Sequence, residues 1–547
     1  MNNLVRLFNW ELISDRKLER AITWAYIAVW LLAILASYMG FNHVAQAEYF
    51  RADPLWMEDY LRDLFERGVD VREWAMTGLG YFPAMFVYGL IRYVTGSIYV
   101  AYVGLGLVCI AIYAGWFYAI LGLITRISRQ HRAWFAMCCT AIMMLVAFLP
   151  RNEALFYDIQ FFTFVNRGST MANAAISILL TLLWLQNPIK GFAWFFPLFA
   201  LSILASITDR VYEIFFMFPA FGAVVILSIL GRVSWRSATW FGGMVLASDL
   251  IGQKIVHWIM PLQMVSYGKI TVLEGWRPVL EFLASLFLQG WYYWIVLFSY
   301  LCLVGVSLFV LRREWKAPRQ PALLGGNSVG YPETAKIFLL SLSVLALPVA
   351  ILSMALINRP GTYNGSANIL VLSFWPFLLV LSQPGLKLWL KGWFHLAVIA
   401  TLGEGMTVLA VYFPAPLSEL LRPAYPHSRM GECLDAHADE LGDGAGIADY
   451  WLARPINLFS KKGIRVYQAQ GPDLSLFQWN GSREVLRKRK YTFVITNTSS
   501  NLQPMREVDV VGSQGRPDVR FVCEGMPVLV YKHGMKGKLF LRDGKND

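Results

Sequence analysis

The chain has 547 residues, of which 56% are hydrophobic and only 15% are charged, and its mean hydropathy is +0.47. Soluble domains carry roughly 25% charged residues, so this composition excludes an ordinary soluble protein and predicts an integral membrane protein. The net charge of +12 does not indicate nucleic-acid binding, because Lys and Arg fall in short clusters between apolar runs. That pattern is typical of residues that set membrane orientation.

The amino-terminal segment has no evident cleavable signal. Residues 1–20 are polar and amphipathic, and the apolar run 21–40 that follows is long enough to cross about 30 Å of hydrocarbon. We therefore expect the first helix to remain as an anchor. Similar runs predict about eleven membrane spans in an α-helical polytopic protein. They lie near 21–41, 97–125, 134–150, 171–187, 192–208, 211–231, 237–257, 282–311, 335–357, 369–382 and 393–413.

Basic clusters predict which side of the membrane each loop occupies. Clusters at 16–20, 126–132, 232–236, 312–319 and 387–391 alternate with less basic loops, so we expect all five in the cytoplasm. The amino terminus is then cytoplasmic, and the first external loop is 42–96. Because 369–382 is short for a span and 82–94 could be an interfacial helix, a change of one span would move the carboxyl-terminal tail to the cytoplasm.

The tail, residues 414–547, differs in character from the transmembrane part, residues 1–413. It has turn-rich polar segments, one plausible helix within 446–463, and short β-type runs at 463–470, 491–498, 519–525 and 527–533. We expect a small α/β or β-rich extracytoplasmic domain. Its two cysteines, Cys433 and Cys523, show no metal-binding spacing and predict one disulfide in an oxidising compartment.

The densest acidic segment of the chain follows directly on the first apolar run. On a helix beginning at Pro54, Asp59, Asp63, Glu66 and Asp70 recur every three to four residues and share one face. The plain interpretation is an amphipathic helix on the bilayer with most acids facing solvent. Asp53, just before Pro54, has the position of a helix N-cap. The functional alternative is that Asp53 is a general base acting on an acceptor hydroxyl or amine.

This organisation resembles the C-type glycosyltransferase superfamily (GT-C), with a first span, a long acidic external loop, many further spans and an external soluble domain. The loop "ADPLWMEDYLRDLFERGVDVREWAMTGLGYFPAMFVYGL" is similar to those of bacterial members, and Asp53, Asp63 and Phe82-Pro83 occupy the corresponding places. The resemblance implies a catalytic acid in this loop, a polyprenyl-phosphate-linked sugar as donor and a bacterial inner-membrane location with a periplasmic tail. The usual acidic doublet is absent at Asp53, and Ala84 follows Phe-Pro. Asp59 and Asp63 therefore remain alternates for the base.

A lipid-phosphate donor needs cations near the external membrane surface. Most arginines at span ends merely snorkel, but the pair Asp209-Arg210 between two apolar runs, and Lys254 in a span that also holds Asp249 and His257, stand out. The expected donor or phosphate-binding residues are Asp209, Arg210, Lys254, Arg277 and Arg359. His43 and His257 belong to no ligand-spaced cluster, which leaves a divalent metal open.

The leading prediction is a membrane glycosyltransferase of the cell envelope. It would move a sugar from a polyprenyl-phosphate donor to a glycan, lipid or protein acceptor at the periplasmic face. Membrane lipid is the other expected partner. The alternatives are a lipid-linked saccharide transporter or flippase, which paired half-chain repeats would favour, and a non-catalytic subunit of a polysaccharide export complex. The sequence shows no such repeat.

Overall fold

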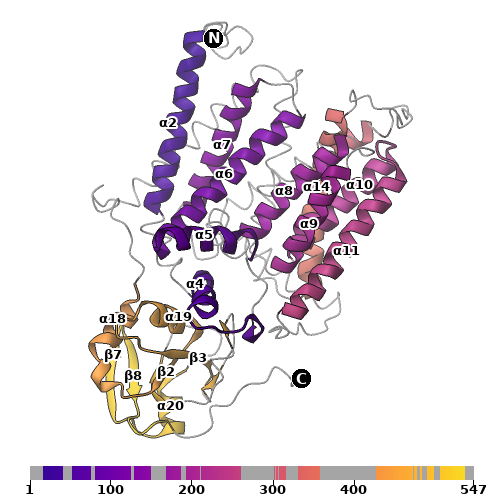
Figure 1. The fold of residues 1–547 in the computed structure, drawn as a ribbon. Coiled ribbons are helices and arrows are strands. Elements are labelled where there is room, and N and C mark those ends of the chain that lie inside the picture. The colour runs from indigo at the N-terminus through magenta and orange to yellow at the C-terminus, as the bar shows by residue number, and fades with distance from the viewer. Residues whose placement is uncertain are drawn as a thin grey trace.

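A computed structural model describes most of the chain. The described residues are 16–40, 52–75, 81–124, 128–148, 168–186, 192–209, 211–259, parts of 301–315, 331–357, 427–471, 474–476, 481–482, 490–497 and 505–535. They form a bundle of long helices, a set of short elements across one end of the bundle, and a C-terminal domain beyond those elements (Figure 1).

The bundle is built from apolar helices that run alongside one another (Figure 1). α2 packs on α7, and α6 packs on both α7 and α8. α9 packs on both α8 and α11, and α10 packs against α11 and α14. These helices are α2 (Arg16–Gly40), α6 (Ile98–Ile124), α7 (Arg129–Phe148), α8 (Gly168–Gln186), α9 (Phe192–Thr208), α10 (Phe218–Ile229, preceded by the π-helical turn η6, Glu213–Met217), α11 (Trp235–Ile259) and α14 (Tyr331–Ile357).

The expected polytopic architecture of eleven GT-C-like spans is wrong. Within the described ranges, two helices, α6 and α8, are long and apolar enough to cross a membrane. Three further apolar helices, Thr23–Leu35, Ala193–Thr208 and Glu213–Ile229, are shorter than the roughly 20 residues that a span needs. The predicted spans at 369–382 and 393–413 lie outside the described residues, as does most of 282–311. The prediction counted apolar runs, and several of these runs form helices that are too short to cross a bilayer.

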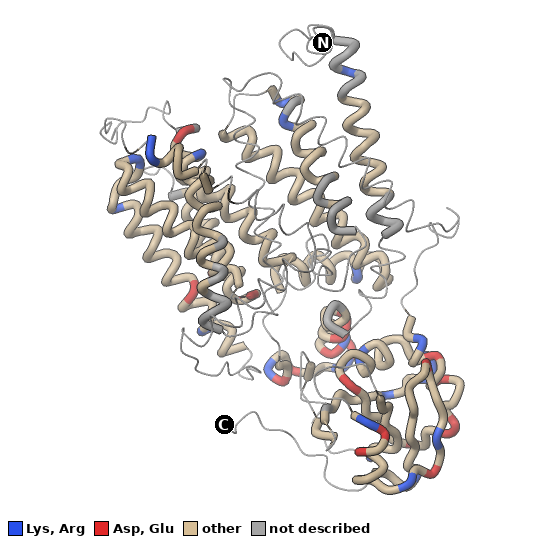
Figure 2. Tube along the Cα trace, turned by 180° about the vertical axis from the view of Figure 1, so that it is seen from behind, with Lys and Arg blue, Asp and Glu red and all other residues tan. Residues whose placement is uncertain are grey.

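Large apolar side chains nevertheless lie exposed along the outside of the bundle. Side chains that are more than half exposed include Trp24, Leu31, Phe196, Trp240, Leu246 and Leu250. Figure 2 shows clusters of Lys and Arg at the end of the bundle opposite the C-terminal domain. The bundle thus has apolar sides and one basic end.

Short elements cross the other end of the bundle, next to the C-terminal domain (Figure 1). They are α4 (Ala52–Phe65), the 3-10 turn η3 (Val71–Glu73), strand β1 (Trp74–Ala75), the π-helical turn η4 (Tyr81–Met85) and α5 (Phe86–Thr95). Leu55, Trp56, Met57 and Tyr60 of α4 are buried in the same apolar core as the bundle helices. This shared core fixes α4 to the end of the bundle.

The C-terminal domain contains a six-stranded mixed sheet with the strand order β4-β3-β2-β6-β8-β7. β2 runs parallel to both β3 and β6, while β4, β7 and β8 pair antiparallel to their neighbours. Helix α19 (Tyr450–Phe459) connects β2 to β3 and packs on the sheet. The strands are β2 (Ala445–Ala448), β3 (Val466–Gln470), β4 (Ser475–Leu476), β6 (Tyr491–Ile495), β7 (Val519–Cys523) and β8 (Met526–Val530). The remaining helices are α18 (Arg429–Ala436), η9 (Ala438–Glu440) and α20 (Glu507–Gln514).

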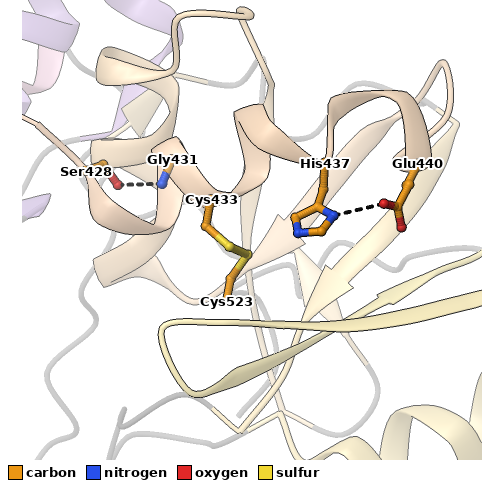
Figure 3. The surroundings of a disulfide bond; sticks show 6 residues. All are labelled: Ser428, Gly431, Cys433, His437, Glu440 and Cys523. Carbon is orange, nitrogen blue, oxygen red and sulfur yellow. Dashed lines mark hydrogen bonds and ion pairs between the residues drawn. A yellow bond between two sulfur atoms is a disulfide. The ribbon is translucent and has the colours of Figure 1, made fainter.

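A disulfide joins Cys433 of α18 to Cys523 at the end of β7, which is the pairing that the sequence predicts (Figure 3). The two Cα atoms are 5.8 Å apart, within the normal range for a disulfide. Ser428 caps α18 by accepting a hydrogen bond from the backbone N–H of Gly431 at 3.0 Å. One turn beyond Cys433, the His437 ring stacks on Phe521. The disulfide and this stack hold α18 against the outer strand of the sheet.

Candidate functional site

The acidic helix α4 lies between the bundle end and the C-terminal domain, and its carboxylates point in more than one direction. The sequence predicted that most of these acids face solvent. That interpretation is wrong for Glu58 and Asp63, which are 1% and 2% exposed. Both have an arginine partner four residues along the chain, but they also have partners in other elements, and the helical period alone did not show that these elements cover the face.

Glu58 joins α4 to α5. Its carboxylate accepts hydrogen bonds from the Tyr88 hydroxyl at 2.8 Å, from Arg92 Nε at 3.0 Å and from Arg62 Nε at 2.9 Å. Burial acts to raise the pKa of Glu58, but the hydrogen bonds from Arg92 and Tyr88 and the charges of Arg92 and Arg62 outweigh it, so the pKa lies below its usual value. Glu58 is therefore a charged structural link between two helices.

Asp59 and Asp63 form a second group, one helical turn apart on α4. Arg67, just after the helix, lies 2.5 Å from Asp63 Oδ1 and 3.6 Å from Asp59 Oδ1, so it links the two carboxylates. The Trp74 indole N–H donates to Asp63 Oδ2 at 3.1 Å. Burial and the negative charge of Asp59 raise the pKa of Asp63 to about 6, against the opposing effects of Arg67 and of a hydrogen bond from Ser482.

The C-terminal domain reaches this pair of acids at two points. Arg454 of α19 places its Nε 3.3 Å from Asp59 Oδ2. Strand β5 (Gly481–Ser482) pairs antiparallel with β1, with Trp74 opposite Ser482. The acid pair is thus enclosed by α4, β1, β5 and α19. We define the acid junction as Asp59, Asp63, Arg67, Trp74, Arg454 and Ser482.

The predicted catalytic residue Asp53 lies in the first turn of α4, which begins at Ala52, so it is not the N-cap that the sequence predicts. Its side chain lies outside the described part of the chain, and its catalytic role stays a prediction. Asp59 and Asp63, the alternates, are brought together.

Asp209 occupies a different place from the acid junction. Its Oδ2 accepts a hydrogen bond from the Thr170 hydroxyl of α8 at 2.8 Å, and its Oδ1 accepts the backbone N–H of Val211 at 3.0 Å. Next to it, the Thr208 hydroxyl accepts the backbone N–H of Phe82 at 3.1 Å, while Asn173 donates to the Phe82 carbonyl at 2.9 Å. These contacts tie η4 to α8 and α9, so Asp209 belongs to a clamp between helix ends.

Of the four predicted phosphate-binding cations, one lies among the described residues. Lys254 is exposed on α11, one turn from Asp249, whose carboxylate accepts a hydrogen bond from Gln253. Arg210, Arg277 and Arg359 lie outside the described residues. Among the residues that are described, no three His, Cys, Asp or Glu side chains come together as metal ligands.

Arg454 is the residue of the acid junction that sequence reasoning missed. It is 4% exposed, its Nη1 donates to the Tyr450 hydroxyl at 3.2 Å, and its guanidinium lies 5.3 Å from the centre of the Tyr450 ring. One signal was present in the sequence, because an arginine among the apolar residues "LARPINLF" of an amphipathic helix needs a partner when it is buried. The sequence did not show that this partner is Asp59.

Comparison with known proteins gives no relative from which to carry over a function, because no family model, curated protein or solved structure matches this chain.

Proposed function

We propose that the protein acts at a membrane as a glycosyltransferase, moving a sugar from a polyprenyl-phosphate donor to a glycan, lipid or protein acceptor. The observation that carries the proposal is the acid junction. It contains a buried carboxylate, Asp63, whose pKa of about 6 suits a general base near neutral pH. Two neighbouring carboxylates in unlike environments are a common basis for dividing catalytic roles.

A membrane location is supported by the surface of the bundle. Exposed apolar side chains such as Trp24, Leu246 and Phe196 suit contact with lipid tails better than contact with water. The basic end of the bundle suits the cytoplasmic side (Figure 2). The C-terminal domain, which carries a disulfide, suits an oxidising compartment such as the periplasm. In this arrangement, α4 lies near the periplasmic face of the inner membrane, where a lipid phosphate and its sugar would be presented.

In the proposed reaction, the acceptor hydroxyl or amine attacks the sugar, and Asp63 takes the proton that the acceptor loses. A carboxylate has about four lone-pair positions, so its contacts with Arg67, Trp74 and Ser482 leave capacity for one more hydrogen bond. The departing polyprenyl phosphate requires a cation. Exposed Lys254 is the described candidate, and Arg210, Arg277 and Arg359 remain predictions for the same role.

The test is a transfer assay with the purified full-length protein and labelled polyprenyl-phosphate sugars, scoring transfer or hydrolysis. We expect Asp63→Asn to abolish transfer and Asp59→Asn to reduce it strongly, while Glu66→Gln, an exposed acid just beyond α4, serves as the control and retains activity. Because Asp63 must be ionised to accept a proton, the rate should fall as the pH decreases below about 6. Full activity of Asp63→Asn would remove it as the base, and Asp53→Asn would then be the next variant to assay.

A second candidate function is a non-catalytic subunit of an export complex. The observation that favours it is that Glu58, Asp59 and Asp63 all contact arginines, as acids in a purely structural junction do. This candidate predicts that none of the donor sugars is hydrolysed or transferred. It also predicts that Asp59→Asn and Asp63→Asn change stability alone, as measured by thermal unfolding.

A further inference from the structure

The contact between Arg454 and Asp59 joins residues that are 395 positions apart in the sequence. Arg454 is nearly fully buried, while the side chain of Asp59 is 19% exposed. A buried guanidinium is costly unless it is paired and hydrogen-bonded. Asp59 of α4 therefore supplies the charged partner that the buried Arg454 of the C-terminal domain needs.

The consequences of this ion pair extend to Asp63. Arg67 contacts both carboxylates, so any change in the charge around Asp59 changes how strongly Arg67 is drawn toward Asp63. In the described part of the chain, the charged and titratable groups facing Asp63 are Asp59 and Arg67, while Arg454 acts on it through Asp59. Trp74 of β1 and Ser482 of β5 also form hydrogen bonds with Asp63.

The two contact points of the C-terminal domain thus converge on the same pair of carboxylates. α19 supplies Arg454 to Asp59, and β5 holds Trp74 through the backbone pairing of Trp74 with Ser482. A domain that was merely tethered to the bundle would not need to bury a cation against this helix.

We propose that the C-terminal domain completes the acid site and that Arg454 is a positioning residue, which fixes Asp59 and thereby the Arg67–Asp63 contact. The catalytic consequence rests on the proposed function, whereas the structural coupling does not. Without Arg454, Arg67 is drawn toward Asp59, Asp63 loses part of its favourable interaction, and the pKa of Asp63 rises further.

The first experiment measures coupling without any activity assay. Hydrogen exchange of α4 and β1 is measured in the full-length protein for wild type, Arg454→Gln, Asp59→Asn and the double variant. We expect Arg454→Gln to speed exchange in α4 and β1 at least about tenfold, because a buried charge pair is broken. The effects of the two single substitutions should not add, since both remove the same interaction.

The matched control is the pair formed by Arg520 and Glu507 on the surface of the same domain. Arg520 Nε lies 2.6 Å from Glu507 Oε1, yet the Arg520 side chain is half exposed. Arg520→Gln should leave exchange in α4 and β1 unchanged, because exposed ion pairs contribute little. If Arg454→Gln behaves like Arg520→Gln, or if the effects of Arg454→Gln and Asp59→Asn simply add, the proposal is overturned.

The second experiment uses the transfer assay and separates positioning from folding. Arg454→Gln should lower kcat more than it raises KM and should move the acidic limb of the pH profile upward by about half to one unit. Arg454→Lys keeps the charge and should restore part of kcat. A pH profile that stays in place, or that moves downward because water enters around Asp63, contradicts the positioning role. If wild type itself shows no transfer, the proposed function fails, and the exchange experiment still decides the coupling.

Discussion

The helical bundle and the C-terminal domain bury their apolar side chains in different ways. The C-terminal domain encloses two apolar clusters, one on each side of its sheet, and among its described residues the exposed large apolar side chains are Trp451, Val508 and Val522. The bundle has a much larger core but also exposes large apolar side chains along several helices. The described surface of the bundle is therefore more apolar than that of the C-terminal domain, and α4 lies between the two.

The largest expected effect is the loss of the disulfide of the C-terminal domain, which tests whether the domain and the bundle unfold separately. Cys433 and Cys523 are separated by 90 residues, and closing a loop of that size stabilises a domain by about 4.5 kcal/mol in the chain-entropy account. We expect Cys433→Ser or reduction to unfold the C-terminal domain while the bundle keeps its helix content. Limited proteolysis with and without reductant measures this. Equal loss of bundle and domain would mean that the two parts do not unfold separately.

The next effect tests how α4 is anchored to the bundle. Glu58→Gln removes the charge that pairs with Arg92 and leaves a partly buried cation, which should cost about 3–5 kcal/mol. Denaturant unfolding measures this free energy. Because the pKa of Glu58 is lowered in the folded state, its stabilisation is present above its usual pKa near 4.5 and is lost as the pH falls below that value. A wild type whose stability does not change below pH 4.5 would argue against the pairing.

A third prediction tests whether the outside of the bundle faces lipid or water. Leu250 is exposed on α11. Replacing it with Asp should cost about 2.5–3.5 kcal/mol if this position faces lipid, and less than about 0.5 kcal/mol if it faces water. Unfolding in lipid bilayers measures the difference, and Val508→Asp on α20 is the control, since Val508 is also more than half exposed but lies on the C-terminal domain. Equal effects of the two substitutions would break the comparison between the regions.

The smallest expected effect is the pH dependence of the acid junction. The pKa of Asp63 is raised, so the docked structure binds its proton more tightly than the unfolded chain does. Its contribution is therefore greatest below pH 4 and is lost as the pH rises through about 6, by about 1–3 kcal/mol in total. Asp63→Asn does not titrate, so the difference between the unfolding curves of wild type and Asp63→Asn isolates this group. We expect wild type to become less stable relative to Asp63→Asn as the pH rises, and a wild type that instead becomes more stable relative to the variant would contradict the raised pKa.

Local patterns in the C-terminal domain were readable from the sequence. Strands β3, β6, β7 and β8 lie in the four β-type runs, and the two cysteines of the tail pair with each other. Within the expected helix at 446–463, however, Gly446 to Ala448 belong to β2, and the helix begins at Tyr450. Asp449 marks that boundary as the N-cap, accepting the backbone N–H of Leu452.

The sequence predicted only some of the residues and contacts of the candidate site. The acid spacing of residues 53–63 places Asp59 and Asp63 on one side of a helix, and the structure brings these two together. Asp209 was grouped with the phosphate-binding residues, but its hydrogen bonds lie with Thr170 and Val211 at the ends of other helices. No pattern in the sequence links Asp59 to Arg454, because nothing within either helix carries information about the other.

The sequence by itself determined the elements whose cause is local. Period, capping residues and β-branched runs act over a few residues, so the sequence predicted helix α4 and four strands of the tail, and its two tail cysteines predicted their pairing. Only the tertiary structure decided which apolar helices are long enough to span and which acids are buried. Both depend on partners from distant segments, and burial of a charge such as Asp63 becomes tolerable only once Arg67, Trp74 and the C-terminal domain have assembled around it.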